Sequence, residues 1–158
     1  MAERTAYVDA LLLLGRRELS VKQVRARLLD REHAPEDVDR AIELLLENRA
    51  LDDTRVAAAF VRTAVKVKGR GRLRIQRELQ EMGIEKEVAA AAIAEAFGEV
   101  DERSLITKAL QKKLRGKPKI ASQAEYARVY QFLMRQGFSP AAVSSVLRVH
   151  RKGGDPLE

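Results

Sequence analysis

Apolar residues recur along almost the whole chain with the spacing of an amphipathic α-helix. No stretch alternates between apolar and polar residues for long enough to predict a β-strand. Proline is confined to positions 35, 118, 140 and 156, which suit helix starts or loops. The pattern therefore predicts an all-α protein of nine helices. Their expected ranges are 4–14, 20–31, 35–48, 52–67, 71–82, 85–97, 101–114, 122–136 and 139–150.

One apolar spacing occurs three times, which indicates an internal repeat. Each copy runs through the second helix of a group of three, across a short turn, and into the third helix. Gly83 and Gly137 fit the left-handed position that ends a helix, and Pro35 and Pro140 fit the start of the helix that follows. The three copies are Val24, Leu28, His33, Val38 and Ile42; Ile75, Leu79, Ile84, Ala89 and Ile93; and Val129, Leu133, Phe138, Val143 and Leu147.

These copies predict three tandem three-helix repeats at residues 1–50, 51–100 and 101–158, the last with a short C-terminal tail. A unit of this size buries too little apolar surface by itself, so neighbouring units are expected to stack. The expected fold is an elongated, curved array of right- or left-handed sense, and the expected oligomeric state is a monomer.

The net charge of +7 is concentrated toward the end of the chain. Residues 101–158 hold 12 Lys and Arg against 5 Asp and Glu, whereas the two preceding segments of 50 residues are nearly balanced. Such an excess suits an anionic partner, either nucleic acid or an acidic protein surface, and simple solubility is the alternative explanation. Cysteine is absent, and no apolar run approaches the ~20 residues that a bilayer span needs, so we expect a cytoplasmic protein that contacts no membrane.

The central part of the chain carries the most distinctive motifs. Residues 50–84 read ALDDTRVAAAFVRTAVKVKGRGRLRIQRELQEMGI, with a Leu-Asp-Asp, an Ala-Phe-Val-Arg, a basic linker that contains Gly, and a Gly-apolar turn. This order resembles the central signature of the RecX regulatory family, and LLLLGRRELSVKQVRARL and FLMRQGFSPAAVSSVL are similar to its first and third units. His33-Ala34 departs from the family's Gly-apolar turn, and Val56 replaces a common aromatic residue. We therefore expect an altered turn and looser packing at these two places.

The resemblance implies a modulator of the RecA recombinase. It implies that the protein binds RecA and the RecA–DNA filament, and that it restrains recombinase, ATPase and coprotease activity in DNA recombination, repair and the SOS response. The residues that carry the structural part of the signature are Leu51, Asp52, Asp53, Phe60, Ile75, Leu79, Gly83 and Gly137. We expect Asp52 and Asp53 to cap the helix that follows them, which stabilises a helix by about 0.5–2 kcal/mol. Contact with a basic patch on RecA is the alternative role for this pair.

Two basic stretches are the candidate contacts for RecA or for DNA phosphates. The first crosses a helix end, a linker that contains Gly69 and Gly71, and the next helix start; a solvated loop is its alternative interpretation. The second follows a helix face and continues beyond it, and no acidic residue lies between positions 103 and 124. Tyr126 and Tyr130, four residues apart, suit either the core or stacking on bases. The basic candidates are Arg62, Lys66, Lys68, Arg70, Arg72 and Arg74, then Lys108, Lys112, Lys113, Arg115, Lys117 and Lys119.

The alternative function is that of a helical protein that binds DNA directly and without sequence preference. Readout of base edges is disfavoured because the last helix of each of the first two repeats is rich in acidic residues, which DNA repels. An enzyme is not expected, because the sequence has no phosphate-binding loop and no nucleophile–base motif. His33 and His150 are the only histidines, so we expect no metal site, no cofactor and no catalytic residues.

Overall fold

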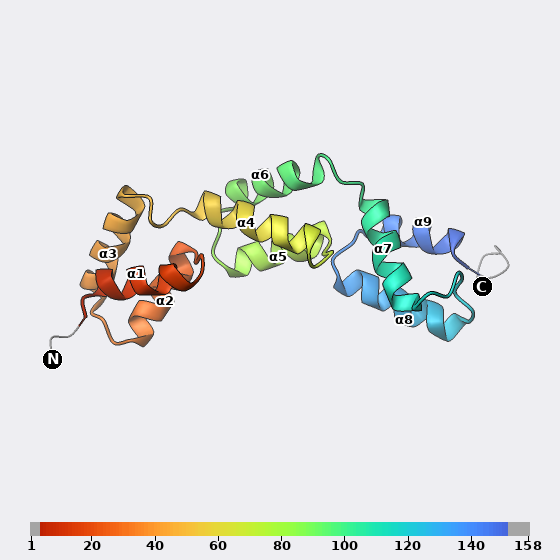
Figure 1. Ribbon diagram of the computed structural model, residues 1–158, viewed down its shortest axis with the longest axis horizontal. Coiled ribbons are helices and arrows are strands. Elements are labelled where there is room, and N and C mark those ends of the chain that lie inside the picture. Colours follow the sequence, from red (N-terminus) through yellow and green to blue (C-terminus); the bar gives the residue numbers. More distant parts are fainter. Residues whose placement is uncertain (1–3, 152–158) are drawn as a thin grey trace. The chain divides into compact units, whose positions relative to one another are not determined.

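The computed structural model describes residues 4–151 and shows nine α-helices in that range (Figure 1). Every helix end lies within two residues of its expected place. The described residues form no β-strand, and their one isolated bridge pairs Ile120 with Arg151. The all-α prediction is therefore confirmed. The helices are α1 (Ala6–Arg16), α2 (Val21–Asp30), α3 (Pro35–Glu47), α4 (Asp53–Lys66), α5 (Arg72–Glu81), α6 (Lys86–Phe97), α7 (Glu102–Leu114), α8 (Gln123–Arg135) and α9 (Pro140–Val149).

Backbone contacts divide these helices between two compact units. The first comprises residues up to 60 together with 78–92, and the second comprises residues 61–77 together with those from 93 onward. Helices α1, α2 and α3 lie wholly in the first unit, and α7, α8 and α9 lie wholly in the second. Helices α4, α5 and α6 contribute residues to both units, so the middle group of three helices is shared between them.

The turn between the second and third helix has the same geometry in all three groups. Glu32, Gly83 and Gly137 adopt left-handed backbone angles, with φ of 66°, 79° and 95°. The next residue then donates its N–H to a carbonyl five residues earlier, which satisfies a carbonyl that the helix end leaves without a partner. These hydrogen bonds run from His33 to Leu28 (3.2 Å), from Ile84 to Leu79 (3.1 Å) and from Phe138 to Leu133 (3.4 Å).

The expected alteration of the first turn is therefore wrong. Glu32, and not His33 or Ala34, occupies the left-handed position there, although a residue with a side chain adopts that conformation at a cost of roughly 1–2 kcal/mol. The expected loosening at Val56 is also absent from the burial pattern, because Val56 is only 3% exposed. The first turn thus keeps the geometry of the other two without a glycine, and Val56 is enclosed without an aromatic ring.

The first unit contains a core formed by α1, α2 and α3. Its fully enclosed side chains include Ala10, Val24, Leu28 and Leu45, which come from all three helices. Four of the five residues in the first copy of the repeat are buried, and the fifth, His33, is half-buried. The repeat spacing therefore marks core positions, as burial of apolar surface requires.

A buried carboxylate ties α1 to the turn between α2 and α3. Asp9 is only 6% exposed, and its two carboxylate oxygens contact Arg31 Nη1 (2.5 Å) and His33 Nε2 (2.8 Å). The hydrogen bond with His33, supported by Arg31, holds the pKa of Asp9 below its ordinary value of 3.8 although burial opposes this. His33 thus serves as a structural partner of Asp9 in this unit.

The second unit contains a core formed by α7, α8 and α9. Leu110, Leu133, Phe138 and Leu147 are fully enclosed there, and the rings of Tyr126 and Tyr130 pack against the same core. Those two rings stack on each other at 6.4 Å between centroids and 15° between planes. Their position supports the core interpretation of the tyrosine pair.

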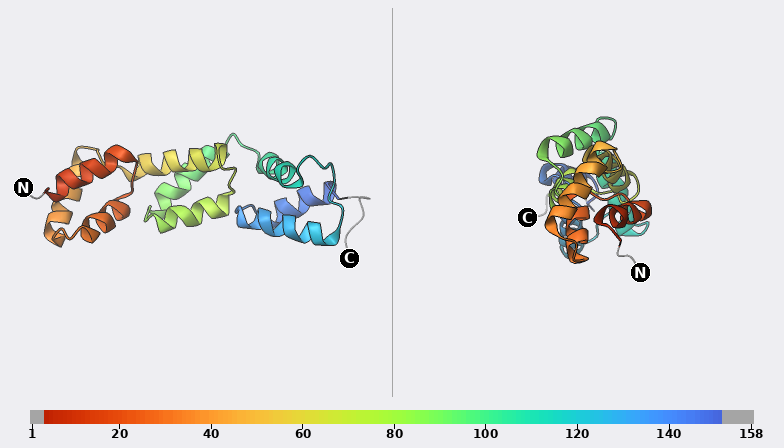
Figure 2. Two further views of the ribbon diagram at one scale, coloured as in Figure 1. Left: turned by 60° about the horizontal axis from the view of Figure 1, so that its bottom comes forward. Right: turned by 90° about the vertical axis from the view of Figure 1, so that its left-hand side faces the viewer.

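The first turn of α5 docks on the turn between α8 and α9. Gly71 N–H donates to the carbonyl of Gln136 (2.7 Å), and Leu73 N–H donates to the carbonyl of Gly137 (3.0 Å). Figure 2 shows the start of α5 beside the end of α8. A Cβ atom on Gly71 would lie 2.4 Å from the backbone carbon of Gly137, so the approach requires glycine.

We predict that Gly71→Ala destabilises the protein by about 1–3 kcal/mol, because the added methyl group meets backbone atoms that cannot move aside. Gly15→Ala is the matched control, since its Cβ would enter open space near the end of α1, where alanine favours the helix by about 0.5–1 kcal/mol. Thermal and denaturant unfolding followed by circular dichroism measures both. Equal stabilities for the Gly71→Ala variant and the parent would show that the docking is not close.

We predict that Asp9→Asn lowers the free energy of unfolding by about 1–3 kcal/mol at neutral pH, because it leaves Arg31 and His33 without their carboxylate. The pKa of Asp9 is lower in the folded state, so its contribution is complete well above pH 3.8 and is lost as the pH falls through the lowered pKa. The difference between parent and variant should therefore shrink in acid. Asp37→Asn, in an exposed ion pair with Arg40, is the control and should cost less than about 1 kcal/mol at any pH. A pH-independent difference for Asp9→Asn would contradict this account.

Candidate binding groove of the second unit

Two basic stretches that lie far apart in the sequence meet at one groove of the second unit. The groove has a volume of about 1030 Å³. One wall is the end of α4 with the linker that follows it, and the other is α7. The segment before α7, Phe132 of α8 and Gln136 just after α8 complete it. Its lining residues are Val65, Lys66, Val67, Lys68, Gly69, Glu99, Val100, Asp101, Ser104, Leu105, Lys108, Ala109, Gln111, Lys112, Phe132 and Gln136.

Four lysines from the two stretches line this groove. Lys66 is the last residue of α4 and Lys68 lies in the linker, whereas Lys108 and Lys112 are one turn apart on the same face of α7. All four are exposed, and none of their side chains has a hydrogen bond or ion pair with another residue in the described range 4–151. Four lysines against the two carboxylates of Glu99 and Asp101 give the groove a positive potential.

The linker holds its lysine in place through backbone hydrogen bonds. Lys68 N–H donates to the carbonyl of Thr63 (3.1 Å), and Arg70 N–H donates to the carbonyl of Ala64 (2.9 Å). Gly69 has φ of 61°, a left-handed conformation that glycine adopts without strain. The linker is therefore a hydrogen-bonded turn at the end of α4, and residues 66–68 are exposed on it.

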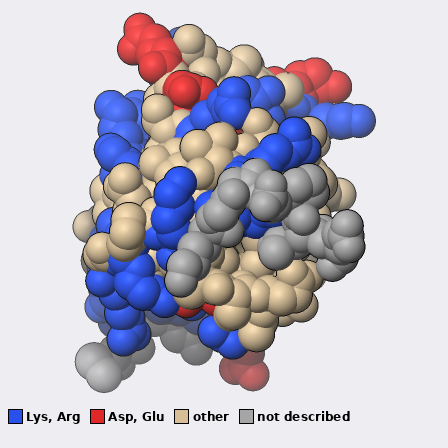
Figure 3. Space-filling view, turned by 90° about the vertical axis from the view of Figure 1, so that its right-hand side faces the viewer, with Lys and Arg blue, Asp and Glu red and all other residues tan. Residues whose placement is uncertain are grey.

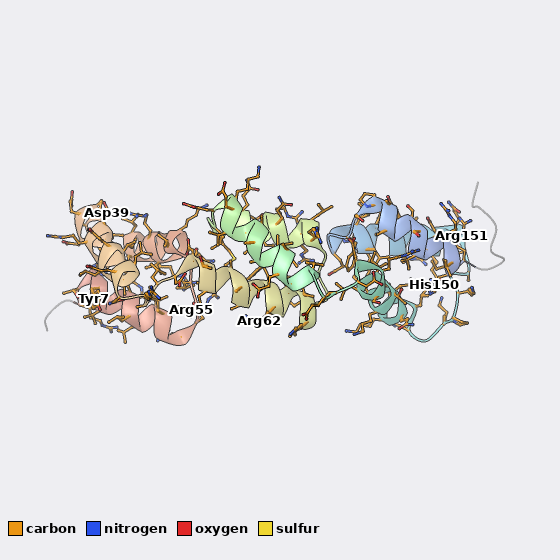
Figure 4. The ribbon with its side chains drawn as sticks, turned by 90° about the horizontal axis from the view of Figure 1, so that it is seen from above. Tyr7, Asp39, Arg55, Arg62, His150 and Arg151 are labelled. Atoms are coloured by element: carbon orange, nitrogen blue, oxygen red, sulfur yellow. The ribbon has the colours of Figure 1, made fainter. Side chains whose placement is uncertain are left out.

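The remaining cations of the first stretch lie outside the groove. Arg62 is exposed on α4 (Figure 4), and Arg72 lies over the ring of Phe97 at 5.1 Å from its centroid. Arg74 Nη1 donates to the carbonyl of Arg135 (3.5 Å), and Arg70 is half-buried with further interactions. The structure thus places two of the six predicted residues in the groove and three in internal contacts, and leaves Arg62 exposed outside the groove.

The second stretch is divided in the same way. Lys113 lies over the ring of Phe132 at 4.8 Å, Lys117 forms an ion pair with Glu125, and Lys119 donates to the carbonyl of Val149 (2.9 Å). Arg115 ends α7 in a left-handed conformation with an exposed side chain. The face of the molecule seen in Figure 3 shows more Lys and Arg side chains than Asp and Glu. Lys117 lowers the pKa of Glu125, as expected for a carboxylate beside a cation.

The residues of the structural signature occupy core and capping positions. Leu51, Ile75 and Leu79 are buried, and Phe60 is half-buried. Asp52 accepts hydrogen bonds from the N–H groups of Thr54 (2.9 Å) and Arg55 (3.3 Å), which is the capping geometry expected at the start of α4.

Asp53 differs from the expectation that it caps α4. Its Oδ1 accepts the N–H of Val21 (2.9 Å), so it serves the first residue of α2. Burial raises the pKa of this carboxyl above its ordinary value. The adjacent aspartates therefore serve the starts of two different helices.

Several residues that line the groove or form internal contacts could not be predicted from the sequence. The apolar residues Val67 and Phe132 and the acidic residues Glu99 and Asp101 line the groove, but nothing in their spacing predicts that they meet. Arg151, next to His150 at the end of α9 (Figure 4), is only 7% exposed and lies over the ring of Tyr126. These contacts depend on the packing of helices and not on any local motif.

The described residues contain no cluster of three or more His, Cys, Asp or Glu side chains with the geometry of a metal site. Among the same residues, no helix has both the length and the apolar character needed to cross a membrane.

The helices of the described residues and their three matching turns define an all-α protein of tandem three-helix repeats. Family models for the first, second and third three-helix domains of RecX match residues 6–45, 52–93 and 101–147. The chain belongs to the RecX family of regulatory proteins.

Relatives called Regulatory protein RecX match over most of the chain. The relative from Pelodictyon phaeoclathratiforme is 31% identical over 144 residues, which cover 91% of this chain and 88% of that protein. The relative from Vibrio parahaemolyticus is 35% identical over 140 residues, which cover 87% and 86%. The relative from Geobacillus kaustophilus is 32% identical over 145 residues, and this chain spans only about half (53%) of its length.

Two solved structures share the fold. A crystal structure of regulatory protein RecX has a TM-score of 0.75 at 24% identity and covers 89% of this chain and 69% of its own. The crystal structure of RecX from Lactobacillus salivarius has a TM-score of 0.72 at 20% identity, with coverage of 91% and 93%. The all-α repeat fold is thus shared with RecX proteins of low sequence identity.

Proposed function

We propose that this protein binds RecA and the RecA–DNA filament in the cytoplasm and restrains recombinase, ATPase and coprotease activity in recombination, repair and the SOS response. Membership of the RecX family supports a regulatory role. RecA as the partner follows from what the resemblance implies. The observation that carries the proposal is the groove, where the side chains of Lys66, Lys68, Lys108 and Lys112 form no ion pair with the described part of the chain.

The acidic surfaces of α3 and α6 argue for a protein partner over direct base readout. The exposed residues of α3 include Glu36, Glu43 and Glu47, and those of α6 include Glu87 and Glu95. A helix that reads base edges lies beside phosphates, which would repel these carboxylates. An adaptor that meets basic and acidic areas of RecA tolerates both surfaces.

Direct binding of DNA without sequence preference is the second candidate. The exposed lysines of the groove favour it, because unpaired cations attract phosphates of any sequence. The two candidates differ in whether RecA must be present for tight binding.

We predict that the protein lowers the single-stranded DNA-dependent ATPase rate of RecA when it is present at less than one copy per RecA subunit. A regulator that acts on a filament affects more subunits than it touches, so the loss should exceed the molar ratio. A coupled ATPase assay over a series of ratios measures this. An unchanged rate at equimolar protein would remove the proposed function.

We predict that affinity for a RecA–DNA filament exceeds affinity for bare DNA of the same length, and that reversal of Lys108, Lys112 and Lys113 to Glu weakens filament binding most at low salt. Fluorescence anisotropy at several salt concentrations measures both. Equal affinity of the parent for filament and bare DNA would favour the second candidate. Circular dichroism of the variant confirms that its helices are intact.

A further inference from the structure

The groove of the second unit has an apolar floor beneath its lysines. Leu105, Ala109 and Phe132 are partly buried against the core of α7–α9 and line the groove. Val67 stands at its edge with 73% of its surface exposed. Attraction of phosphates does not require apolar lining, whereas exposed apolar surface framed by polar side chains is typical of a site that receives another protein.

The charges of the groove have two signs and a definite distribution. Lys66 and Lys68 lie on the wall formed by the end of α4 and its linker, and Lys108 and Lys112 lie on the wall formed by α7. Glu99 and Asp101 line the same groove in the segment before α7. The carboxylate of Asp101 caps α7 by accepting the N–H of Arg103 (3.1 Å), so its position there is fixed.

This distribution fits a peptide better than a nucleic acid. A nucleic acid carries a negative charge at every phosphate, so a strand that follows the groove would bring phosphates close to Glu99 and Asp101. A peptide carries negative charge only where Asp or Glu occurs and can present an uncharged or basic residue at those two positions. Its apolar side chains can also enter between the two walls, where they are removed from water.

We propose that this groove binds an acidic protein segment that also carries apolar side chains. Carboxylates of the segment pair with Lys66, Lys68, Lys108 and Lys112, and its apolar side chains contact Val67 and the floor. The identity of the protein that supplies the segment rests on the proposed function. The chemistry of the segment rests on the groove alone. The lysine pairs make the binding sensitive to salt, and the apolar contacts leave a part that salt does not screen.

The test uses the full chain and four fluorescent probes: a peptide of Glu, Gly and Leu, a peptide with Ser in place of Leu, a peptide with Lys in place of Glu, and an oligothymidylate of the same net charge as the first peptide. We expect the first peptide to bind most tightly. Replacement of Leu by Ser or of Glu by Lys should weaken binding. The oligothymidylate should bind less tightly than the first peptide at every salt concentration.

Two variants and a matched control locate the binding. Lys108→Glu with Lys112→Glu should weaken binding of the first peptide about tenfold, since two attractions become repulsions. Val67→Ser, at an exposed position, should weaken it while leaving the salt dependence unchanged. Arg77→Glu with Arg148→Glu makes the same change in net charge at exposed positions outside the groove and should leave the affinity within about twofold.

Oligothymidylate that binds as tightly as the first peptide would overturn the inference in favour of nucleic acid. Equal weakening by the groove variant and by the control would overturn it as well, because the effect would then be one of net charge alone. Failure of the RecA ATPase experiment removes RecA as the partner and leaves the peptide result standing. Loss of peptide binding with filament binding intact removes the groove inference alone.

Discussion

The hydrogen bonds between the first turn of α5 and the turn that joins α8 to α9 are the contact on which the second unit depends. The first N–H groups of a helix and its last carbonyls have no partner within the helix, and burial of either without a partner costs about 1–3 kcal/mol. Gly71 and Leu73 donate to the carbonyls of Gln136 and Gly137, so the start of one helix and the turn that ends another satisfy each other. Such bonds need backbone to meet backbone, and only glycine at position 71 leaves room.

The equivalent position in the first unit is served by different chemistry. Ser20 lies at the start of α2, as Gly71 lies at the start of α5, and its hydroxyl donates to the carbonyl of Met82 (2.5 Å) in the turn between α5 and α6. The N–H of Val21 is satisfied by Asp53 from the start of α4. The Ser20 side chain thus makes in the first unit a contact that the backbone N–H of Gly71 makes in the second. In both units the start of a helix contacts the turn of the next group of three helices, but the chemical groups that form the contact differ.

The docking of α5 also explains why two distant basic stretches form one groove. The linker between α4 and α5 is tied to the end of α4 by the N–H groups of Lys68 and Arg70, and to the turn after α8 by the N–H of Gly71. Lys68 and Val67 are therefore presented beside α7, where Lys108 and Lys112 stand. Other cations of the same stretches are engaged in ring contacts, ion pairs or carbonyl contacts, as for Lys113, Lys117 and Lys119. A count of charges along the sequence does not separate the lysines that line the groove from those engaged in internal contacts. The packing of the helices separates them.

The sequence by itself determined the nine helices, their limits to within two residues, and the threefold repetition of buried positions, because these features depend on the period of apolar residues and on local helix-ending signals. It also contained the signature of the RecX family. The tertiary structure alone decided that His33 contacts Asp9, that Asp53 serves α2, and that four of the twelve predicted basic residues line one groove. Each of these depends on contacts between residues distant in sequence, and such contacts leave no periodic pattern in a single chain.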